Sequence, residues 1–339
     1  MSMSNRDRSR WKIFFWLVAG CLVPSAYFGY RAGGEDPLRG IAAGIASCLF
    51  IATPILLLEV KGRRLPVVRR LQRLPIVIYF AIRVVFYVIV IVAGLMAARL
   101  VVDGHVTFGE VFEGGGFAFS VAMAVVANVA FTMGSLLGFR MVGRLATGRY
   151  VRPRRELRAF LLIDMKNSTG VAERLGAVRF HELLNDFFRD VAEAALECGA
   201  EIHKYVGDEV ILTWPAARAT LDDDMLACPF VVRDFIAASG AQYLRRFGVV
   251  PEFRAAMHCG EVVAGQIGDV RAEIAYVGDT LNVAARLLEA AKEVGRDVLT
   301  SADLLAKATL PSGILAEALP TLTVRGREAP LGIAALSRA

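Results

Sequence analysis

The sequence predicts two parts of different fold class, an all-α membrane domain of four helices followed by an α+β domain. Its mean hydropathy of +0.50 and hydrophobic content of 55% are too high for an ordinary soluble enzyme. Charge is divided along the chain: residues 1–158 contain 21 Lys and Arg against 8 Asp and Glu, while residues 159–339 contain 18 against 25. The apolar stretches also end before residue 140, where alternating strand and helix patterns take over.

Four apolar stretches lie at residues 11–30, 40–58, 84–98 and 117–139. Each approaches the ~20 residues that a helix needs to cross ~30 Å of hydrocarbon. We therefore expect a four-helix transmembrane domain over residues 1–139.

The loops between these stretches differ in charge. Lys and Arg gather before the first stretch, between the second and third, and after the fourth, whereas the other two loops are balanced or acidic. Because cytoplasmic loops retain basic residues, both termini and the polar half are expected to be cytoplasmic, in a multi-pass protein of the plasma (inner) membrane. The basic residues thus adjoin lipid, which argues against nucleic acid as a partner.

Several residues of the apolar half invite a second interpretation. Arg83 resembles a buried functional charge, but we expect it to snorkel to the inner interface before a span that begins at residue 84. Asn128, Thr132 and Ser135 recur at about one-turn spacing and predict a polar seam between helices, with a ligand pocket as the alternative. Cys21 ends a lipoprotein-like cleavage box, yet the apolar run continues past it, which favours an intact span.

Residues 140–158 are basic with apolar residues interspersed, and they contain helix-breaking Gly and Pro. This composition predicts a linker that lies against anionic headgroups. It fits an inert anchor as well as a segment that transmits conformational change.

The polar half, residues 159–339, alternates between strand and helix patterns. We expect strands at 159–163, 201–206, 209–214, 253–258, 261–267 and 273–277, and helices at 178–196, 222–247 and 280–294. The order β-α-β-β-α-β is that of a ferredoxin-like sheet layered with helices, here with extra strands.

Four motifs stand out in this half: Phe160-Leu-Leu-Ile-Asp164 with Ser168-Thr169, Lys204-Tyr-Val-Gly-Asp208-Glu, Met257-His-Cys-Gly-Glu-Val-Val-Ala-Gly265, and Gly278-Asp-Thr-Leu-Asn282-Val-Ala-Ala-Arg286. Together they resemble the catalytic domain of class III nucleotidyl (adenylyl/guanylyl) cyclases. The resemblance covers about residues 157–330 and leaves out the membrane half. It implies an ATP- or GTP-cyclising enzyme.

Cyclisation needs an activated 3′-hydroxyl and neutralised phosphate charge, which two divalent ions such as Mg²⁺ or Mn²⁺ can supply. Asp164 ends a strand and Asp208 lies at a hairpin tip, so the two carboxylates would meet if the strands are neighbours. Oxygen ligands of this kind suit hard cations. The resemblance implies that both aspartates bind metal, with the Met165 carbonyl as a further ligand.

The resemblance also implies a site shared between two protomers of a homodimer. Asn282 and Arg286 are one turn apart on one helix face, and by resemblance Asn282 orients the ribose while Arg286 stabilises charge at the α-phosphate. Arg325 or Arg327 matches a late basic residue that grips the terminal phosphates. One chain carries every group, so a homodimer can build two sites by symmetry.

Lys204 occupies the position that by resemblance recognises the base. Adenine N1 accepts a hydrogen bond, which suits a lysine, whereas the N1–H of guanine would suit a glutamate. Lys204 therefore favours ATP, and the expected products are cyclic AMP and pyrophosphate. The usual partner position, three residues before Gly278, is Ala275, which has no acceptor. A guanylate cyclase remains the alternative.

Two further hypotheses stay open. The Gly-Asp-Glu hairpin resembles that of diguanylate cyclases. Two features argue against this assignment: Val206 stands where that family has the first of its paired glycines, and residues 282–286 read Asn-Val-Ala-Ala-Arg. A membrane receptor that uses an inactive cyclase domain as a dimeric binding module is kept open by Ala275. His203 and His258 flank motif positions, and we expect both to be structural.

Overall fold

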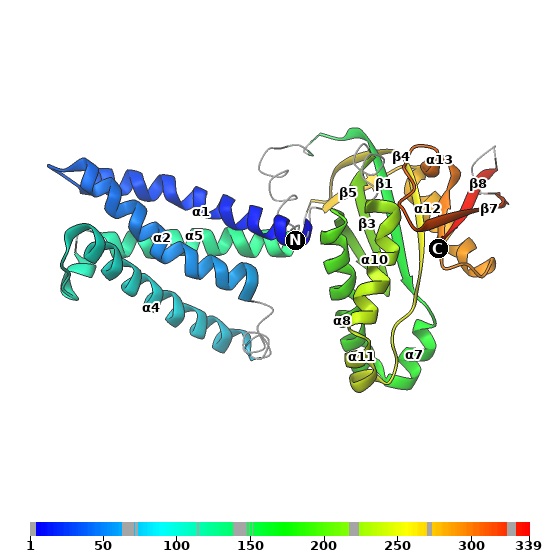
Figure 1. Cartoon of the computed structure of the whole chain (residues 1–339), viewed down its shortest axis with the longest axis horizontal. Helices are drawn as coiled ribbons and strands as arrows, with labels where there is room; N and C mark the ends of the chain where they lie inside the picture. Colours follow the sequence, from blue (N-terminus) through cyan, green and yellow to red (C-terminus); the bar gives the residue numbers. More distant parts are fainter. Residues whose placement is uncertain are drawn as a thin grey trace. The chain divides into compact units, whose positions relative to one another are not determined.

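The computed structural model describes residues 5–62, 71, 74–113, 115–137, 148, 150, 152–216, 224–269, 273–323 and 330–339. The chain divides into a helical unit, Asp7–Thr147, and a second unit whose main part is Gly148–Ala339. Figure 1 shows the helical unit in blue to cyan and the second unit in green to red.

The described part of the helical unit consists mainly of long helices. The helices are α1 (Asn5–Ala32), α2 (Pro37–Lys61), α4 (Ile76–Asp103) and α5 (Gly116–Leu137), with a 3₁₀ turn, η2, at Gly109–Phe112. The Asp36 carboxylate caps α2 by accepting the Arg39 backbone N–H at 3.1 Å.

Three of these helices are long and apolar enough to cross a membrane. The segments are Trp11–Ala32, Pro37–Glu59 and Ala81–Asp103. The part of α5 that meets the same standard of apolarity, Gly116–Ala130 among the described residues, is shorter. Three of the expected spans are thus matched by suitable helices, and the fourth stays a prediction.

Helices α1 and α2 approach each other closely at glycines. A Cβ placed on Gly29 would lie 2.1 Å from the Gly40 carbonyl oxygen, and one on Gly44 would lie 2.2 Å from the Ser25 carbonyl oxygen. Larger side chains at these positions would force the backbones apart, so the small residues set the distance between the two helices.

Arg83 lies in a polar cluster that the sequence did not predict. Its guanidinium is paired with the buried Glu59 carboxylate of α2 and donates to the Tyr87 hydroxyl at 2.9 Å. Asn128 of α5 donates to the same hydroxyl at 2.7 Å. Arg83 is therefore partnered within the protein, and Asn128 joins helices as expected, because a charge near lipid is costly unless it is paired. The side chains of Thr132 and Ser135 lie outside the described part.

The second unit is built on a mixed sheet, eight-stranded in the described residues, with the order β2-β3-β1-β4-β6-β8-β7 and β5 paired with β4. The strands are β1 (Arg154–Met165), β2 (Glu201–Val206), β3 (Glu209–Pro215), β4 (Phe253–Ile267), β5 (Glu273–Val277), β6 (Val298–Ser301), β7 (Ile314–Leu322) and β8 (Leu331–Arg338). Strands β2, β3, β1 and β4 lie in the ferredoxin-like order, as predicted.

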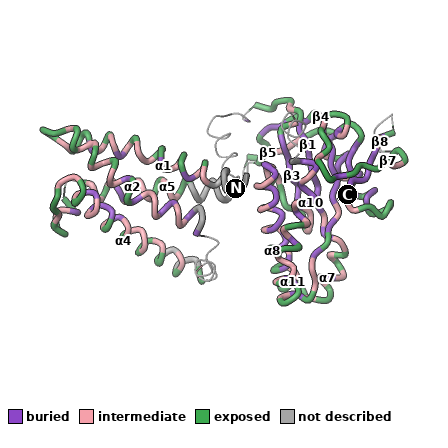
Figure 2. Tube along the Cα trace, viewed as in Figure 1, coloured by how far each residue is buried: buried purple, intermediate pink, exposed green. Residues whose placement is uncertain are grey.

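Helices cover both faces of this sheet (Figure 1). They are α7 (Ser168–Leu175), α8 (Ala177–Glu197), α10 (Asp224–Ala238), α11 (Gly240–Phe247), α12 (Asp279–Glu293) and the short α13 (Ala302–Leu305). Leu161 and Ile163 of β1 pack in one core with α8 and α10, whereas Phe160 and Leu162 pack in another with α12. Because side chains alternate along a strand, Asp164 belongs to the α12 face. The central strands are the most buried part of the unit (Figure 2).

Several elements differ from the sequence-based expectation. The helix expected at 222–247 is divided at Ser239 into α10 and α11. The strands expected at 253–258 and 261–267 form one continuous strand, β4, because β1 pairs with it along twelve residues from Arg154 to Met165. Strand β1 accordingly begins inside the basic segment that the sequence predicts as a linker.

Arg158 is part of the sheet and is fully buried, although it closes the basic segment in sequence. Its guanidinium donates to the Tyr276 hydroxyl and to Glu201 at 3.3 and 3.4 Å, and it stacks over the Tyr276 ring at 4.8 Å. A buried arginine needs such partners to offset desolvation. Arg158 thus belongs to the interior of the second unit.

Candidate active site

The pairing of β1 with β3 brings the two predicted metal-binding aspartates together. In the antiparallel register Asp164 lies opposite Glu209, the residue that follows Asp208. Strands β2 and β3 meet at a tight hairpin where Val206 pairs with Glu209 and Gly207 has φ +62°. Glycine adopts this left-handed conformation without strain, so the turn holds Asp208 beside the end of β1.

Burial and acidic neighbours raise the pKa values of two carboxyl groups at this point, Asp164 and Glu209. Burial, the charge of Asp208 and a hydrogen bond with Asp208 raise the pKa of Asp164 to about 6. Burial and the charges of both aspartates raise the pKa of Glu209 to about 7. Clustered carboxylates with raised pKa values hold unfavourable negative charge. A bound cation would relieve that repulsion.

Two basic side chains also act on Asp164. Arg254, its Cα partner on β4, and Lys292, on α12, both oppose the rise in the pKa of Asp164 through their positive charge. A group of acidic and basic side chains therefore surrounds the end of β1. Such mixed charge suits a site that binds both cations and phosphate oxygens.

The donor set fits Mg²⁺ or Mn²⁺. Mg²⁺ in phosphoryl-transfer sites is held by one or two carboxylates together with substrate phosphates and waters. Asp164 and Asp208 supply two carboxylates, and no group of three or more metal-ligating side chains occurs in the described part of the chain. The Met165 side chain is buried in the core, so Met165 could offer an ion only its backbone carbonyl.

Asn282 and Arg286 lie on the exposed face of α12. The opposite face, with Val283, Leu287 and Ala291, packs against the sheet. Arg286 forms an ion pair with Glu289 at 2.7 Å. Both predicted catalytic side chains are therefore available to groups outside the unit's own core.

Lys204 is linked to the strand that carries Ala275 through a third residue, Glu273. The Lys204 ammonium is 3.3 Å from each carboxylate oxygen of Glu273, and both side chains are about half exposed. Glu273 and Ala275 are two residues apart on β5, so they project from the same face of the strand. Glu273 thus provides, beside Lys204, the hydrogen-bond acceptor that the Ala275 side chain lacks.

His203 and Tyr276 lie beneath this group. Their rings are 4.8 Å apart, edge to face, and Tyr276 also contacts Arg158. Burial and the positive charges of Lys204 and Arg158 lower the pKa of His203 to about 4, so it is neutral at physiological pH. His258 is buried, with Nδ1 2.8 Å from the Ser301 hydroxyl. His258 is thus an interior residue, whereas His203 is half-buried against Tyr276.

Arg325 and Arg327 lie outside the described residues. The predicted site residues that are described form three groups. The groups are Asp164 with Asp208 and Met165, Lys204 with β5, the strand that carries Ala275, and Asn282 with Arg286.

Comparison with known proteins identifies the second unit. Residues 153–329 match the family model described as the adenylate and guanylate cyclase catalytic domain, which is more than half of the chain. The chain belongs to this cyclase family. The predicted resemblance is confirmed, and Gly148–Ala339 is called the cyclase unit below.

Relatives extend the likeness beyond the cyclase unit. The chain is 35% identical over 332 residues to Adenylate cyclase 2 of Rhizobium meliloti (strain 1021), covering 95% of this chain and 88% of the relative. Adenylate cyclase 1 of the same organism is 27% identical over 51% of this chain and 26% of its own length. A solved bacterial light-regulated adenylyl cyclase has the same fold, with a TM-score of 0.55 and 14% identity, covering 65% of this chain and 64% of that one.

The structure places four further charged residues at the site that the sequence analysis did not select. Glu209, Arg254 and Lys292 adjoin Asp164, and Glu273 adjoins Lys204. Glu209 could have been found from the hairpin pattern, because it follows Asp208 directly. The other three depend on contacts between distant segments of the cyclase unit, which no local pattern records.

Proposed function

We propose that this protein is a membrane-bound adenylate cyclase, a phosphorus–oxygen lyase that converts ATP to 3′,5′-cyclic AMP and pyrophosphate. The observation that carries the proposal is the β1–β3 pairing, which brings Asp164 and Asp208 together in a member of the cyclase family. The likeness of nearly the whole chain to a protein named Adenylate cyclase 2 supports ATP as the substrate.

Asp164 and Asp208, with the Met165 carbonyl, would hold two divalent ions, Mg²⁺ or Mn²⁺. When bound, such ions neutralise phosphate charge and favour the ionised form of the attacking 3′-hydroxyl. The aspartates repel each other in one small space, and this repulsion favours cation binding. Arg254 and Lys292 add positive charge beside Asp164 and attract the triphosphate.

Asn282 and Arg286 would act on the nucleotide held by a second copy of the chain. Lys292, on the same helix, is the residue close enough to influence Asp164, and Asn282 lies ten positions earlier, about 15 Å along α12. The side chains of Asn282 and Arg286 face away from the sheet of their own chain. In the homodimer Asn282 orients the ribose, Arg286 stabilises charge at the α-phosphate, and Arg325 or Arg327 binds the terminal phosphates.

The Lys204–Glu273 pair would recognise the base. It presents one donor and one acceptor side by side. Adenine offers the complementary edge, with N1 accepting from Lys204 and the N6 amine donating to Glu273. Guanine would fit only in the opposite order, with O6 on Lys204 and N1–H on Glu273. Glu273 thus replaces the acceptor missing at Ala275 and favours adenine when Lys204 faces N1.

Glu273→Ala is expected to lower kcat/KM for ATP by about tenfold, because an unpaired amine in a recognition site costs 1–3 kcal/mol. Glu273→Gln keeps an acceptor oxygen and should lose less. The measurement is the initial rate of cyclic nucleotide formation with ATP and with GTP.

The control is Glu317→Ala, which breaks a similarly exposed ion pair with Arg296 away from the site. It should leave both rates unchanged. If Glu273→Ala instead raises the ratio of ATP to GTP turnover, Glu273 reads guanine, and the base assignment is wrong.

The membrane part completes the proposal. We infer four spans, α5 being the fourth, with both termini and the cyclase unit on the cytoplasmic side. The three long apolar helices and the basic loops support this topology. Cytoplasmic placement would give the site access to ATP.

The test uses purified full-length protein with Mg²⁺ or Mn²⁺ and either ATP or GTP, followed by identification of the product. Cyclic AMP as the main product is expected. Cyclic GMP as the main product would indicate a guanylate cyclase. No product from either nucleotide would favour a receptor that uses the cyclase unit as a binding module.

A further inference from the structure

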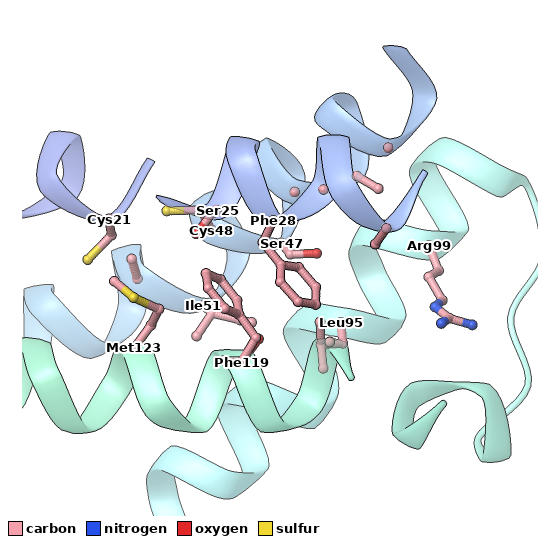
Figure 3. A pocket seen from close by; sticks show the side chains of 18 of the residues that line it. Cys21, Ser25, Phe28, Ser47, Cys48, Ile51, Leu95, Arg99, Phe119 and Met123 are labelled. Atoms are coloured by element: carbon pink, nitrogen blue, oxygen red, sulfur yellow. The ribbon is translucent and has the colours of Figure 1, made fainter. Parts of the chain in front are cut away.

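The helical unit contains a cavity of about 690 Å³ between α1, α2, α4 and α5. Figure 3 shows it from close by, with Phe28, Ser47 and Ile51 in the middle and Cys21 and Arg99 toward opposite ends. The volume falls within the range of small-molecule binding sites, roughly 300–1,000 Å³. Nothing in the chemistry of the cyclase unit uses this space.

The walls of the cavity are mainly apolar. Phe28 of α1 stacks on Phe119 of α5 with ring centroids 4.3 Å apart. Ile51, Leu95 and Met123 complete the apolar lining. The hydroxyls of Ser25, Ser47 and Ser120 also line it. Such walls favour a ligand with an apolar body and few polar atoms.

One end of the cavity carries charge. It is lined there by side chains from the connections that follow α1 and α4 and from the facing helix ends: Glu35, Asp36, Arg39, Arg99, Asp103 and Glu113. Arg39 is paired with Asp103 at 2.7 Å, and Arg99 with Glu110 at 3.4 Å. Both guanidiniums are therefore already neutralised.

The acidic side chains at this end outnumber the basic ones. Glu35 and Glu113 have no ion-pair partner within the described ranges, and the Asp36 carboxylate accepts only a backbone N–H there. The charged end thus has surplus negative charge, carried by exposed carboxylates. A cation is the complementary group.

We propose that this cavity binds a small apolar molecule with one cationic head, a hydrophobic amine. The apolar body lies against Phe28 and Phe119, and the ammonium faces Glu35 and Glu113. In the topology inferred above, the charged end opens away from the cytoplasm. The proposal concerns binding alone, so it does not depend on the identity of the cyclase product.

The test is a binding measurement on the full-length protein in lipid nanodiscs. The probe is a dansyl group on a short alkyl chain that ends in an amine, compared with matched probes that end in a carboxylate or an alcohol. Saturable fluorescence enhancement is expected with the amine, and its affinity should exceed that of the carboxylate by tenfold or more. Protein-free nanodiscs measure partition into lipid.

Two variants test separately how the cationic head and the apolar body of the ligand are bound. Glu35→Gln combined with Glu113→Gln should weaken amine binding about tenfold and leave the alcohol unchanged, because each tenfold step corresponds to about 1.4 kcal/mol of lost pairing. Both side chains are exposed, so the fold should not be affected. Ser47→Phe fills the cavity and should abolish binding of all three probes.

Val23→Phe is the matched control for Ser47→Phe, because Val23 is 74% exposed on α1 and is not among the cavity residues. It should bind the probes as the unaltered protein does. Equal affinity for the three probes, or amine binding that survives both Ser47→Phe and the glutamine pair, would overturn the proposal. The proposal is also overturned if the fluorescence of the amine probe never saturates and matches its partition into protein-free nanodiscs. That result is expected if lipid or a second copy of the chain fills the cavity.

Discussion

Replacing Asp208 with alanine is expected to lower kcat for cyclic AMP formation by at least about a thousandfold. Loss of this carboxylate removes one of the two side chains that would hold the divalent ions, and these ions contribute several kcal/mol of transition-state stabilisation. The measurement is product formation by full-length protein over a range of Mg²⁺ and Mn²⁺ concentrations. Asp208→Asn should be nearly as defective, because it keeps the shape and loses the charge.

Stability should not account for this loss. Asp208 contributes repulsion that raises the pKa of Asp164, so its removal relieves strain between the two charges and should leave the thermal unfolding midpoint unchanged or slightly higher. Asp234→Ala, which breaks an exposed ion pair between Asp234 of α10 and Arg338 of β8, serves as a control and should keep full activity. Retention of a tenth or more of the activity by Asp208→Ala would exclude the metal-binding role.

A mixture of Asp208→Ala and Arg286→Ala chains should regain activity that neither variant has alone. In a symmetric homodimer with shared sites, the mixed dimer has one site that lacks both groups and one that is complete. If the chains exchange freely, half of the dimers are mixed, and about one quarter of the unaltered activity is expected. Cyclic AMP formation after co-expression of two differently tagged chains measures it.

The informative control is a mixture of Asp164→Ala and Asp208→Ala chains. Both aspartates would serve the same half of a site, so each site in the mixed dimer still lacks one of them and no activity should return. Mixed dimers recovered through both tags, yet inactive in the first mixture, would contradict the sharing of sites. Activity in the control mixture would contradict the assignment of both aspartates to one half-site.

The aspartate pair could be predicted from the sequence because local patterns determine its geometry. The apolar run that ends at Asp164 and the Gly207-Asp208 turn are both local signals, and adjacency of the strands then follows from the fold. The pairing of Asp164 with Glu209 shows that the two strands are neighbours, and the metal-binding role of the two aspartates stays a prediction. The ferredoxin-like order of β2, β3, β1 and β4 was predictable for the same reason.

Other parts depend on contacts that composition does not record. Arg158 reads as one more basic residue of the linker, but its burial comes from Tyr276 and Glu201, which are distant in sequence. Arg83 reads as a snorkelling residue, but Glu59 and Tyr87 enclose it. The Lys204–Glu273 pair likewise joins strands 69 positions apart. In each case a partner from another element decides the role of the charge.

Strand β1 bears on how any stimulus could reach the catalytic groups. It is the first strand after the helical unit. It pairs with β4 from Arg154 to Met165 and with β3 from Arg158 to Asp164. Tension applied at its beginning is spread across two neighbouring ladders before it arrives at Asp164. Mechanical input would therefore move the sheet as one block. In the proposed homodimer, one protomer's aspartates would then shift relative to the other protomer's α12, while the spacing between the aspartates stays constant.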